Sequence, residues 1–312
     1  MIRLDNSALG LYKNCKRAFY YAHVRGLFPK TFGNALFDGS VFHQAVADFM
    51  TTKIVDFKKI ETEYTKLVDQ VTNPEDVIDI EDRQAKMIGM LTSYISKYES
   101  DHTKYKIIAV EEKIEYRLPN NSDEVVIYGT PDTWLEEIDT KNILLLENKT
   151  TSRIDSSYLK RLALDAQLSM YYWLYNMKFG RYPDGIVYNI ATKTQSYRKK
   201  NETLEQFTQR MIEYYQKPKK GEDENISLYR EYLHRTPQQI EGFSRQLQVK
   251  IDEIVLLMHN KNHKYFIDFF YQNDRYCTAY NNQCAYMPLC IDGEENCLAA
   301  YNQNNERLVY NG

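Results

Sequence analysis

Two short acidic motifs, each at the end of a predicted β-strand, constrain the fold of this chain more than any other feature. The β-branched run at residues 125–127 leads through Gly129 to Asp132 in the motif GTPD, and the apolar run at residues 143–146 ends at Glu147 in the motif ENK. A glycine and a proline turn the chain after the first strand. Glu147 follows Asp132 by 15 positions, which is hairpin-like spacing. We therefore expect these carboxylates to converge.

Convergent carboxylates indicate a metal site. They repel each other unless a cation lies between them, and hard oxygen ligands select Mg²⁺ or Mn²⁺ over softer metals. Lys149 follows Glu147 by two residues, so both side chains lie on one face of the strand. Its ammonium group can orient a water molecule or stabilise charge on a phosphate oxygen. The motifs thus favour cleavage of phosphodiester bonds; the competing interpretation is a hairpin with a surface salt bridge.

A long helix is predicted after the second motif. Residues 155–179 form a helical stretch of about seven turns, and Gly180 stands where helices prefer to stop. Gln167 and Tyr171 are four residues apart and share one face. Their amide and phenol could reach a scissile phosphate. Alternatively, Tyr171 is one more aromatic residue in a tyrosine-rich helix.

GTPD, ENK and the following Gln-x-x-x-Tyr resemble, in order and spacing, the PD-(D/E)xK nuclease superfamily. The branch they resemble contains RecB-type recombination exonucleases, phage exonucleases and CRISPR-associated iron–sulfur nucleases. The resemblance implies an α/β fold: a restriction-endonuclease-like mixed β-sheet core flanked by helices, with an N-terminal helical region and a C-terminal cysteine-rich segment. It also implies that Lys149 positions the attacking water while Gln167 and Tyr171 hold the substrate and the lysine. The catalytic residues would be Asp132, Glu147, Lys149, Gln167 and Tyr171.

Two further motifs extend the resemblance. GSVFH, which ends at His43, is similar to the helix start whose histidine contributes to the family's metal site; the plain alternative is a partly buried histidine at a helix edge. AVEEK occupies the place of the family's additional acidic residue. Strand alternation directs only one of Glu111 and Glu112 inward without saying which, and we take Glu111. The implied ligands of Mg²⁺ or Mn²⁺ are His43, Glu111, Asp132, Glu147 and the backbone carbonyl of Asn148.

The five cysteines provide separate evidence. No signal peptide or transmembrane run is visible, so we expect a cytoplasmic protein of a bacterial or phage-infected bacterial cell, where structural disulfides are not expected. Clustered thiols in a reducing compartment favour a metal or iron–sulfur site. By resemblance, a [4Fe-4S] cluster joining the two chain ends would be held by Cys15, Cys277, Cys284 and Cys290, although the first gap is longer than the family's commonest spacing. Cys297 could replace Cys277, and Zn²⁺ or unligated cysteines stay open.

The formal charge of −3 is not that of a strongly DNA-binding protein, so DNA contacts must come from local basic clusters. Phosphates bind lysine and arginine, and single-stranded bases stack on aromatic rings, of which the 27 tyrosines supply many. A solvated basic loop fits each cluster equally well. The first cluster contains Lys193, Arg198, Lys199 and Lys200, and we expect DNA contacts from the first three. The second cluster contains Lys217, Lys219 and Lys220.

We expect one nuclease domain over residues 1–312. Its parts are a helical region (1–100) with Cys15 and His43, the PD-(D/E)xK core (101–200), a second helical part (201–265) and a cysteine-cluster segment (266–312) that closes onto the N-terminus. The expected helices are 7–21, capped by Ser7, several over 39–100 with a break near Asn73, then 155–179, 204–216 and 237–258. The expected strands are 107–117, 125–136, 142–151 and 185–192.

These features together predict a metal-dependent DNA nuclease, an exonuclease in phage or bacterial DNA replication, recombination or processing. One alternative is a catalytically silent DNA-binding scaffold of the same fold, although no carboxylate or lysine of the motifs is lost. Another is a metal-dependent hydrolase of a different substrate. No G-x-x-x-x-G-K-[ST] motif is present, so a partner such as a helicase or recombination protein must open the DNA, or the substrate is already open. Residue spacing does not report polarity, strand preference, exonuclease or endonuclease behaviour, or oligomeric state. No membrane contact is expected.

Overall fold

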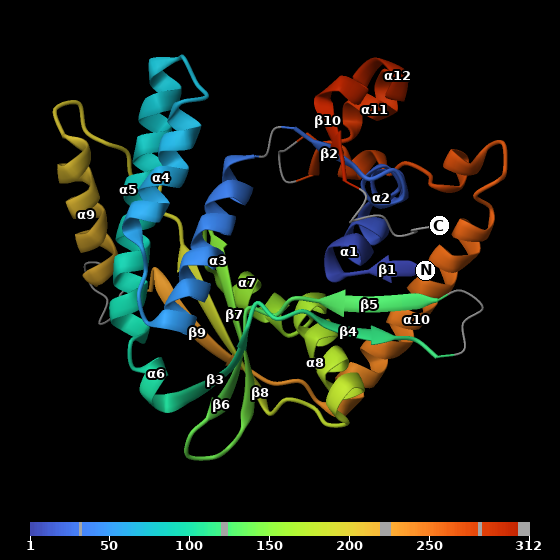
Figure 1. The fold of residues 1–312 in the computed structure, drawn as a ribbon, viewed down its shortest axis with the longest axis horizontal. Coiled ribbons are helices and arrows are strands. Elements are labelled where there is room, and N and C mark those ends of the chain that lie inside the picture. The colour runs from blue at the N-terminus through green and yellow to red at the C-terminus, as the bar shows by residue number, and fades with distance from the viewer. Residues whose placement is uncertain (31–32, 120–123, 219–225, 280–282, 305–312) are drawn as a thin grey trace.

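The computed structural model shows a mixed α/β fold with a five-stranded sheet, a three-stranded sheet and helices around them (Figure 1). The α/β class and the mixed sheet expected from the sequence are therefore confirmed. Two large hydrophobic clusters lie on opposite faces of the five-stranded sheet. The structure describes residues 1–30, 33–119, 124–218, 226–279 and 283–304.

The five-stranded sheet has the order β3-β6-β7-β8-β9, in which β7 and β8 are parallel and the other neighbours antiparallel. Side chains alternate along each strand, so Leu145 of β7 packs in one hydrophobic cluster and Leu146 in the other. Both faces of the central strands are thus covered, as expected of a parallel pair. The strands are β3 (Tyr105–Val110), β6 (Thr133–Glu137), β7 (Ile143–Thr151), β8 (Gly185–Thr192) and β9 (Leu228–Leu233).

The strands predicted over residues 107–117 and 125–136 are each divided in two, so this part of the prediction is wrong. The first is interrupted at Glu111, whose φ of 50° is left-handed, and the second at Thr130 and Pro131. At both points the chain passes between the two sheets. The smaller sheet has the order β1-β5-β4, built from β1 (Ile2–Leu4), β4 (Ile114–Arg117) and β5 (Val125–Gly129).

Four helices form a layer on one side of the larger sheet, with the short α6 beside them (Figure 1). Asn73 caps α5 by accepting a hydrogen bond from the backbone N–H of Glu75, as the predicted break there requires. The expectation that GSVFH begins a helix is wrong, because α3 already begins at Asn34 and His43 lies in its interior. The helices are α3 (Asn34–Thr52), α4 (Phe57–Val68), α5 (Pro74–Tyr98), α6 (Asp101–Lys104) and α9 (Leu204–Gln216).

The single helix predicted over residues 155–179 is two helices. Asp155 caps α7 through the N–H of Tyr158, and Asp165 caps α8 through the N–H of Leu168, so each aspartate starts its own helix. Gly180 ends α8 in the left-handed conformation, as predicted. The other side of the larger sheet, opposite α3 and α5, is covered by α7 (Ser156–Leu162), α8 (Ala166–Phe179) and α10 (Pro237–His259).

The N-terminal segment also differs from the single helix predicted over residues 7–21. Asp5, not Ser7, caps α1, and Cys15 adopts an extended conformation that separates α1 from α2. The C-terminal segment packs back onto this region, since β10 pairs with β2 and the Tyr286 hydroxyl donates to the carbonyl of Leu27. The elements are α1 (Asn6–Asn14), α2 (Lys16–Phe19), a π-helix (Tyr20–Val24), β2 (Leu27–Pro29), 3-10 turns (Phe266–Phe269, Asp274–Tyr276, Leu298–Ala300), α11 (Met287–Ile291), α12 (Glu294–Cys297) and β10 (Tyr301–Gln303).

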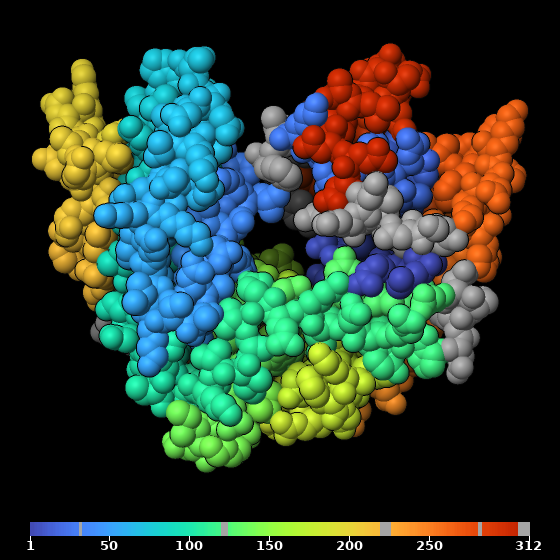
Figure 2. Space-filling model, viewed as in Figure 1, coloured from blue at the N-terminus to red at the C-terminus, as the bar shows by residue number. Residues whose placement is uncertain are grey.

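Figure 2 shows a surface deeply hollowed between α3 and α4 on one side and the packed N- and C-terminal segments on the other. The three-stranded sheet forms the floor, and β5 ends there before the chain turns into β6 (Figures 1 and 2). None of the helices in the described part of the chain is long and apolar enough to cross a membrane.

Candidate active site

Asp132 lies in the turn between β5 and β6, and one oxygen of its buried carboxylate is firmly held. Its Oδ2 accepts hydrogen bonds from the backbone N–H and from Nδ2 of Asn148, at 2.7 and 3.1 Å. Its Oδ1 lies 3.3 Å from Nδ1 of His43. Burial opposes ionisation, but the His43 contact and the positive charge of Lys149 outweigh it and lower the pKa of Asp132. The carboxylate is thus kept charged and fixed.

Glu147 is completely buried on β7, beside Lys149. The Lys149 ammonium donates to Oε1 of Glu147 at 2.5 Å, whereas Oε2 has no hydrogen-bond partner among the described residues. Burial and the charge of Asp132 raise the pKa of Glu147 to about 7 against the opposing effect of Lys149. Burial alone would lower the pKa of Lys149, but Glu147 and Asp132 raise it. A buried carboxylate oxygen without a donor is costly unless a cation satisfies it.

His43, Glu111 and Asp132 form the candidate metal centre. Ligand atoms of these three residues all lie within 4.8 Å of one another, although they come from α3, the end of β3 and the turn after β5. The left-handed backbone at Glu111 and the hydrogen bond from its N–H to the carbonyl of Asp132, 2.9 Å, keep it at this place. Desolvation and the charge of Asp132 raise the pKa of Glu111 to about 6. The two carboxylates are the kind of ligand that suits Mg²⁺ or Mn²⁺.

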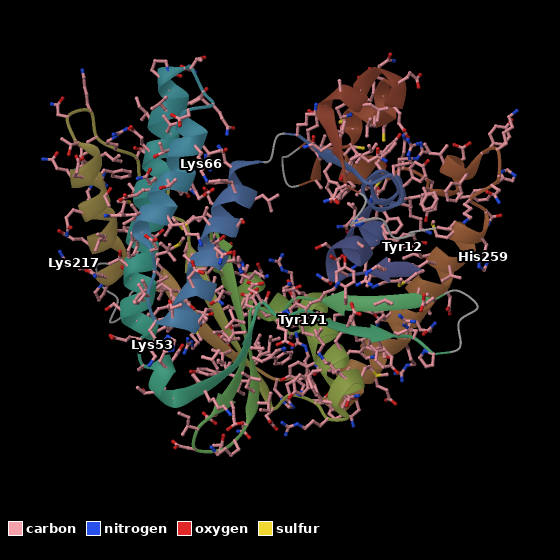
Figure 3. All side chains as sticks on the ribbon, viewed as in Figure 1. Tyr12, Lys53, Lys66, Tyr171, Lys217 and His259 are labelled. Atoms are coloured by element: carbon pink, nitrogen blue, oxygen red, sulfur yellow. The ribbon has the colours of Figure 1, made fainter. Side chains whose placement is uncertain are left out.

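Gln167 and Tyr171 lie behind the Asp132 turn. Gln167 donates through Nε2 to the Tyr171 hydroxyl at 2.9 Å, and that hydroxyl donates to the carbonyl of Thr130 at 3.0 Å. Gly129 makes this contact possible, since a Cβ atom there would lie 2.6 Å from Cε1 of the Tyr171 ring. In Figure 3 Tyr171 lies below the floor of the hollow. The described hydrogen bonds support the turn that carries Asp132.

Asn148 has a side chain that reaches away from Glu147 and Lys149, because neighbours on a strand face opposite sides. Its Oδ1 accepts from the Tyr94 hydroxyl and from Nδ2 of Asn189. The sequence motifs indicated only the backbone carbonyl of Asn148 as a ligand and did not indicate that Tyr94 and Asn189 contact its side chain. The available signal was a buried asparagine in the otherwise apolar strand GIVYNIAT, because a polar group there needs a partner.

The three predicted DNA contacts lie in different surroundings. Lys193 has its Nζ 3.9 Å from Asp38, and Arg198 is paired with two carboxylates of α5, Glu81 and Asp82, at 2.6 and 3.1 Å. Lys199 is exposed. In the second cluster Lys217 pairs with Glu213, and residues 219 and 220 lie outside the described part of the chain. The DNA contacts remain predictions.

A groove of about 470 Å³ lies at the carboxyl ends of the parallel strands β7 and β8, beyond Lys149. Its lining includes two basic residues and, among the described residues, no acidic one. Five serine and threonine hydroxyl groups and one tyrosine also line it. Arg153, which the sequence analysis did not select, has a side chain that is 79% exposed and 3.4 Å from Asp155. The lining residues include Ser152, Arg153, Lys193, Thr194, Ser196 and Tyr214.

The five cysteines are free thiols and belong to one region of the fold. Cys15 is buried in the hydrophobic cluster that also contains Leu145 of β7, and Cys284, Cys290 and Cys297 pack against that cluster. Burial raises the pKa of Cys284 and outweighs a backbone hydrogen bond at Tyr286 that lowers it, while the neighbouring thiols of Cys15 and Cys277 raise it further. No three described cysteine sulfurs all lie within 4.8 Å of one another.

The sequence of the chain matches a known family of enzymes. The sequence model of the PD-(D/E)XK nuclease superfamily matches residues 4–291. The chain therefore belongs to the PD-(D/E)XK nuclease superfamily, whose nucleases use divalent metals. No curated protein matches the chain. Among solved structures, it is similar to one titled "Crystal structure of SSO0001", at 14% identity over 67% of this chain and 83% of that chain, with a TM-score of 0.25.

Proposed function

We propose that the protein is a metal-dependent DNA nuclease, and specifically an exonuclease. The observation that carries the proposal is the convergence of His43, Glu111 and Asp132 within 4.8 Å, next to the unpartnered buried oxygen of Glu147. Surface salt bridges of a hairpin would not leave a carboxylate oxygen buried without a donor. Membership of a nuclease superfamily supports the same chemistry.

The divalent metal, Mg²⁺ or Mn²⁺, would be held by His43, Glu111, Asp132 and Glu147, with the carbonyl of Asn148 as a further ligand. The donor set fits such an ion, since carboxylate and carbonyl oxygens suit Mg²⁺ and Mn²⁺ and outnumber the one imidazole. When bound, the ion would lower the pKa of a coordinated water and offset charge on the phosphate.

The remaining residues would act on the substrate and on the site itself. Lys149, held by Glu147 and with 29% of its side chain exposed, would orient the attacking water and stabilise charge on the phosphate oxygens. Gln167 and Tyr171 would hold the turn that places Asp132. Hydrolysis then adds water across one P–O bond: the water oxygen bonds to phosphorus, and the departing sugar oxygen takes up a proton.

The groove beyond Lys149 supports a nucleic-acid substrate. A strand rises about 3.3 Å per residue, so Ser152 of the groove lining lies roughly 10 Å along the chain from Lys149. That distance suits a neighbouring backbone phosphate, and a groove with Arg153, Lys193 and several hydroxyl groups favours an anionic strand. Tyr214 adds an aromatic surface of the kind on which bases stack.

For the cysteines we propose a [4Fe-4S] cluster held by Cys15, Cys277, Cys284 and Cys290, with Cys297 free. What supports it is the sequence pattern and the shared position of Cys15, Cys284 and Cys290 in one packed region. The cluster would join the two ends of the chain.

The test uses anaerobically purified protein, Mn²⁺ and four substrates: end-labelled single-stranded DNA, end-labelled double-stranded DNA, closed circular DNA, and RNA of the same sequence. Wild type is compared with Lys149→Ala and with Lys178→Ala, a matched control that removes an exposed lysine of α8 away from the site. Losing a preorganised charged group costs about a hundredfold or more in rate. We expect Lys149→Ala to lose at least that much and Lys178→Ala to behave as wild type.

Each substrate decides one part of the proposal. Shortening of end-labelled DNA with circular DNA intact supports an exonuclease, and the label lost first gives its polarity. Cleavage of circular DNA would show an endonuclease, and cleavage of RNA alone would overturn the DNA assignment. Full activity of Lys149→Ala would overturn the role of the lysine. Binding by both proteins without cleavage would indicate a silent scaffold.

A further inference from the structure

Three polar residues form a buried row across the larger sheet, on the face opposite Glu147 and Lys149. Asn148 of β7, Asn189 of β8 and Arg230 of β9 are successive cross-strand partners. The two asparagines are each 1% exposed. Nε of Arg230 donates to Oδ1 of Asn189 at 2.7 Å, and Nδ2 of Asn189 donates to Oδ1 of Asn148 at 3.1 Å. The row ends at the carboxylate of Asp132.

The donors of Arg230 determine the direction of every hydrogen bond in this row. A guanidinium group can only donate, and Asp101 holds this one in place with two hydrogen bonds of 2.9 and 2.6 Å. Asn189 must therefore turn its oxygen toward Arg230 and its Nδ2 toward Tyr94, 2.8 Å away, and Asn148. The Tyr94 hydroxyl, which accepts from Asn189, donates to Oδ1 of Asn148 at 2.7 Å.

The orientation of the Asn148 amide follows from these contacts. Its oxygen receives two donors, from Tyr94 and Asn189, so its Nδ2 is turned to Oδ2 of Asp132. The opposite orientation would place the amide oxygen against a carboxylate and leave buried donors unpaired. Oδ2 of Asp132 is thereby occupied by Asn148, which leaves Oδ1 at the metal-centre side, near His43.

We propose that Tyr94, Asn189 and the Arg230–Asp101 pair are positioning residues for the metal centre. They act through Asn148, whose orientation they set, and Asn148 fixes which oxygen of Asp132 is offered to a divalent cation. Groups that orient a metal ligand from behind control metal affinity as well as activity. The proposal rests on the proposed function, because it assigns a role toward the same cation site.

The test measures Mn²⁺ binding by titration calorimetry without substrate, so that it does not depend on turnover. Asn189→Asp keeps the acceptor for Arg230 but removes the donors to Tyr94 and Asn148. Tyr94→Phe removes one donor to Asn148. Tyr12→Phe is the matched control, since Tyr12 is also buried, loses one hydrogen bond to Glu253 and lies in α1, away from Tyr171 (Figure 3).

We expect Asn189→Asp to weaken Mn²⁺ binding about tenfold, with a smaller loss for Tyr94→Phe, in the range seen when such supporting residues are changed. Tyr94→Phe should lower the melting temperature at least as much as Tyr12→Phe, because the Tyr94 hydroxyl makes two hydrogen bonds. Only Tyr94→Phe should weaken Mn²⁺ binding. If Asn189→Asp does not fold, Tyr94→Phe carries the test. Changing a residue that supports a metal ligand typically costs about tenfold or more in metal affinity. The proposal would be overturned if the folded variants bound Mn²⁺ within about twofold of the wild-type affinity. A wild-type protein that binds no Mn²⁺ would overturn the proposed function and this inference together.

Discussion

Tyr171 and Gly129 act together on the turn that carries Asp132. The Tyr171 hydroxyl binds the carbonyl of Thr130, and its ring occupies the space in which a side chain on Gly129 would lie. The Tyr171 ring is buried in the core, so it cannot move into solvent to make room for a side chain at position 129. The glycine is thus required for close approach.

Gly129→Ala should therefore lower both nuclease activity and stability. The added methyl group meets Cε1 of Tyr171 at 2.6 Å, and overpacking of this kind costs about 1–3 kcal/mol. Urea unfolding and cleavage of labelled DNA measure the two effects. Gly10→Ala is the control, because nothing lies within 4 Å of its added Cβ in α1, and alanine favours a helix. An unchanged Gly129→Ala protein would contradict the described packing.

Glu147 should make the stability of the metal-free protein depend on pH. Its folded-state pKa of about 7 exceeds the value of roughly 4.3 expected in an unfolded chain. The folded state binds the extra proton between these values, so the contribution of this group is fully present below about pH 4 and is lost as the pH rises through about 7. The loss amounts to about 4 kcal/mol.

Unfolding by urea in EDTA at pH 5 and pH 8 tests this expectation. Between these pH values wild type should lose more stability than Glu147→Gln, which cannot ionise, and added Mn²⁺ should restore wild type at pH 8. Equal pH dependence of the two proteins would show that Glu147 ionises freely in the folded state.

The groove at the ends of β7 and β8 should bind single-stranded DNA through Arg153. In EDTA, which prevents cleavage, Arg153→Ala should weaken binding several-fold and reduce the slope of log K against log salt by about 0.7, the share of one phosphate contact. Fluorescence anisotropy at several salt concentrations measures both. Arg161→Ala is the control, an exposed arginine on α7 that does not line the groove. An unchanged slope for Arg153→Ala would exclude the groove from the DNA path.

The elements that the sequence predicted well are those in which one local pattern decides. The predicted bounds of β8 and α9 are those of the structure, and Gly180 ends α8 as expected. The break at Glu111 was missed because strand-forming residues continue on both sides of it while the chain changes sheets. The turn at Gly129 and Pro131 was predicted, but the strand expected over residues 125–136 ran through it. β9 was missed because Arg230 interrupts its alternation, and its partner Asp101 is 129 residues away.

The candidate site divides in the same way. Asp132, Glu147 and Lys149 stand close together in sequence motifs, so their proximity was predictable from strand spacing. The row from Asn148 through Asn189 to Arg230 was not predictable, because it requires the order of three strands in the sheet. Tyr94 belongs to the helix α5, and no local sequence pattern predicts that this helix packs against Asn148.

The two ends of the chain meet over the cysteines, so an iron–sulfur cluster there would stabilise the whole molecule. Anaerobically purified wild type should contain about four iron atoms per chain, and Cys15→Ser and Cys290→Ser should lose iron and melt at lower temperature. Cys297→Ser is the control within the same region and should keep its iron. Iron in Cys15→Ser at the wild-type level, or iron lost only in Cys297→Ser, would contradict the ligand set.

The pairing of β2 with β10 joins residues 27–29 to residues 301–303. Contacts between such distant segments form late in folding, because the intervening chain must first be ordered. During synthesis β2 cannot pair with β10 until nearly all of the described chain has left the ribosome. A polypeptide truncated before β10 would lack this pairing, and the wall of the hollow formed by the joined termini would be incomplete. Loss of the last strand should therefore impair a site whose motifs lie more than a hundred residues earlier.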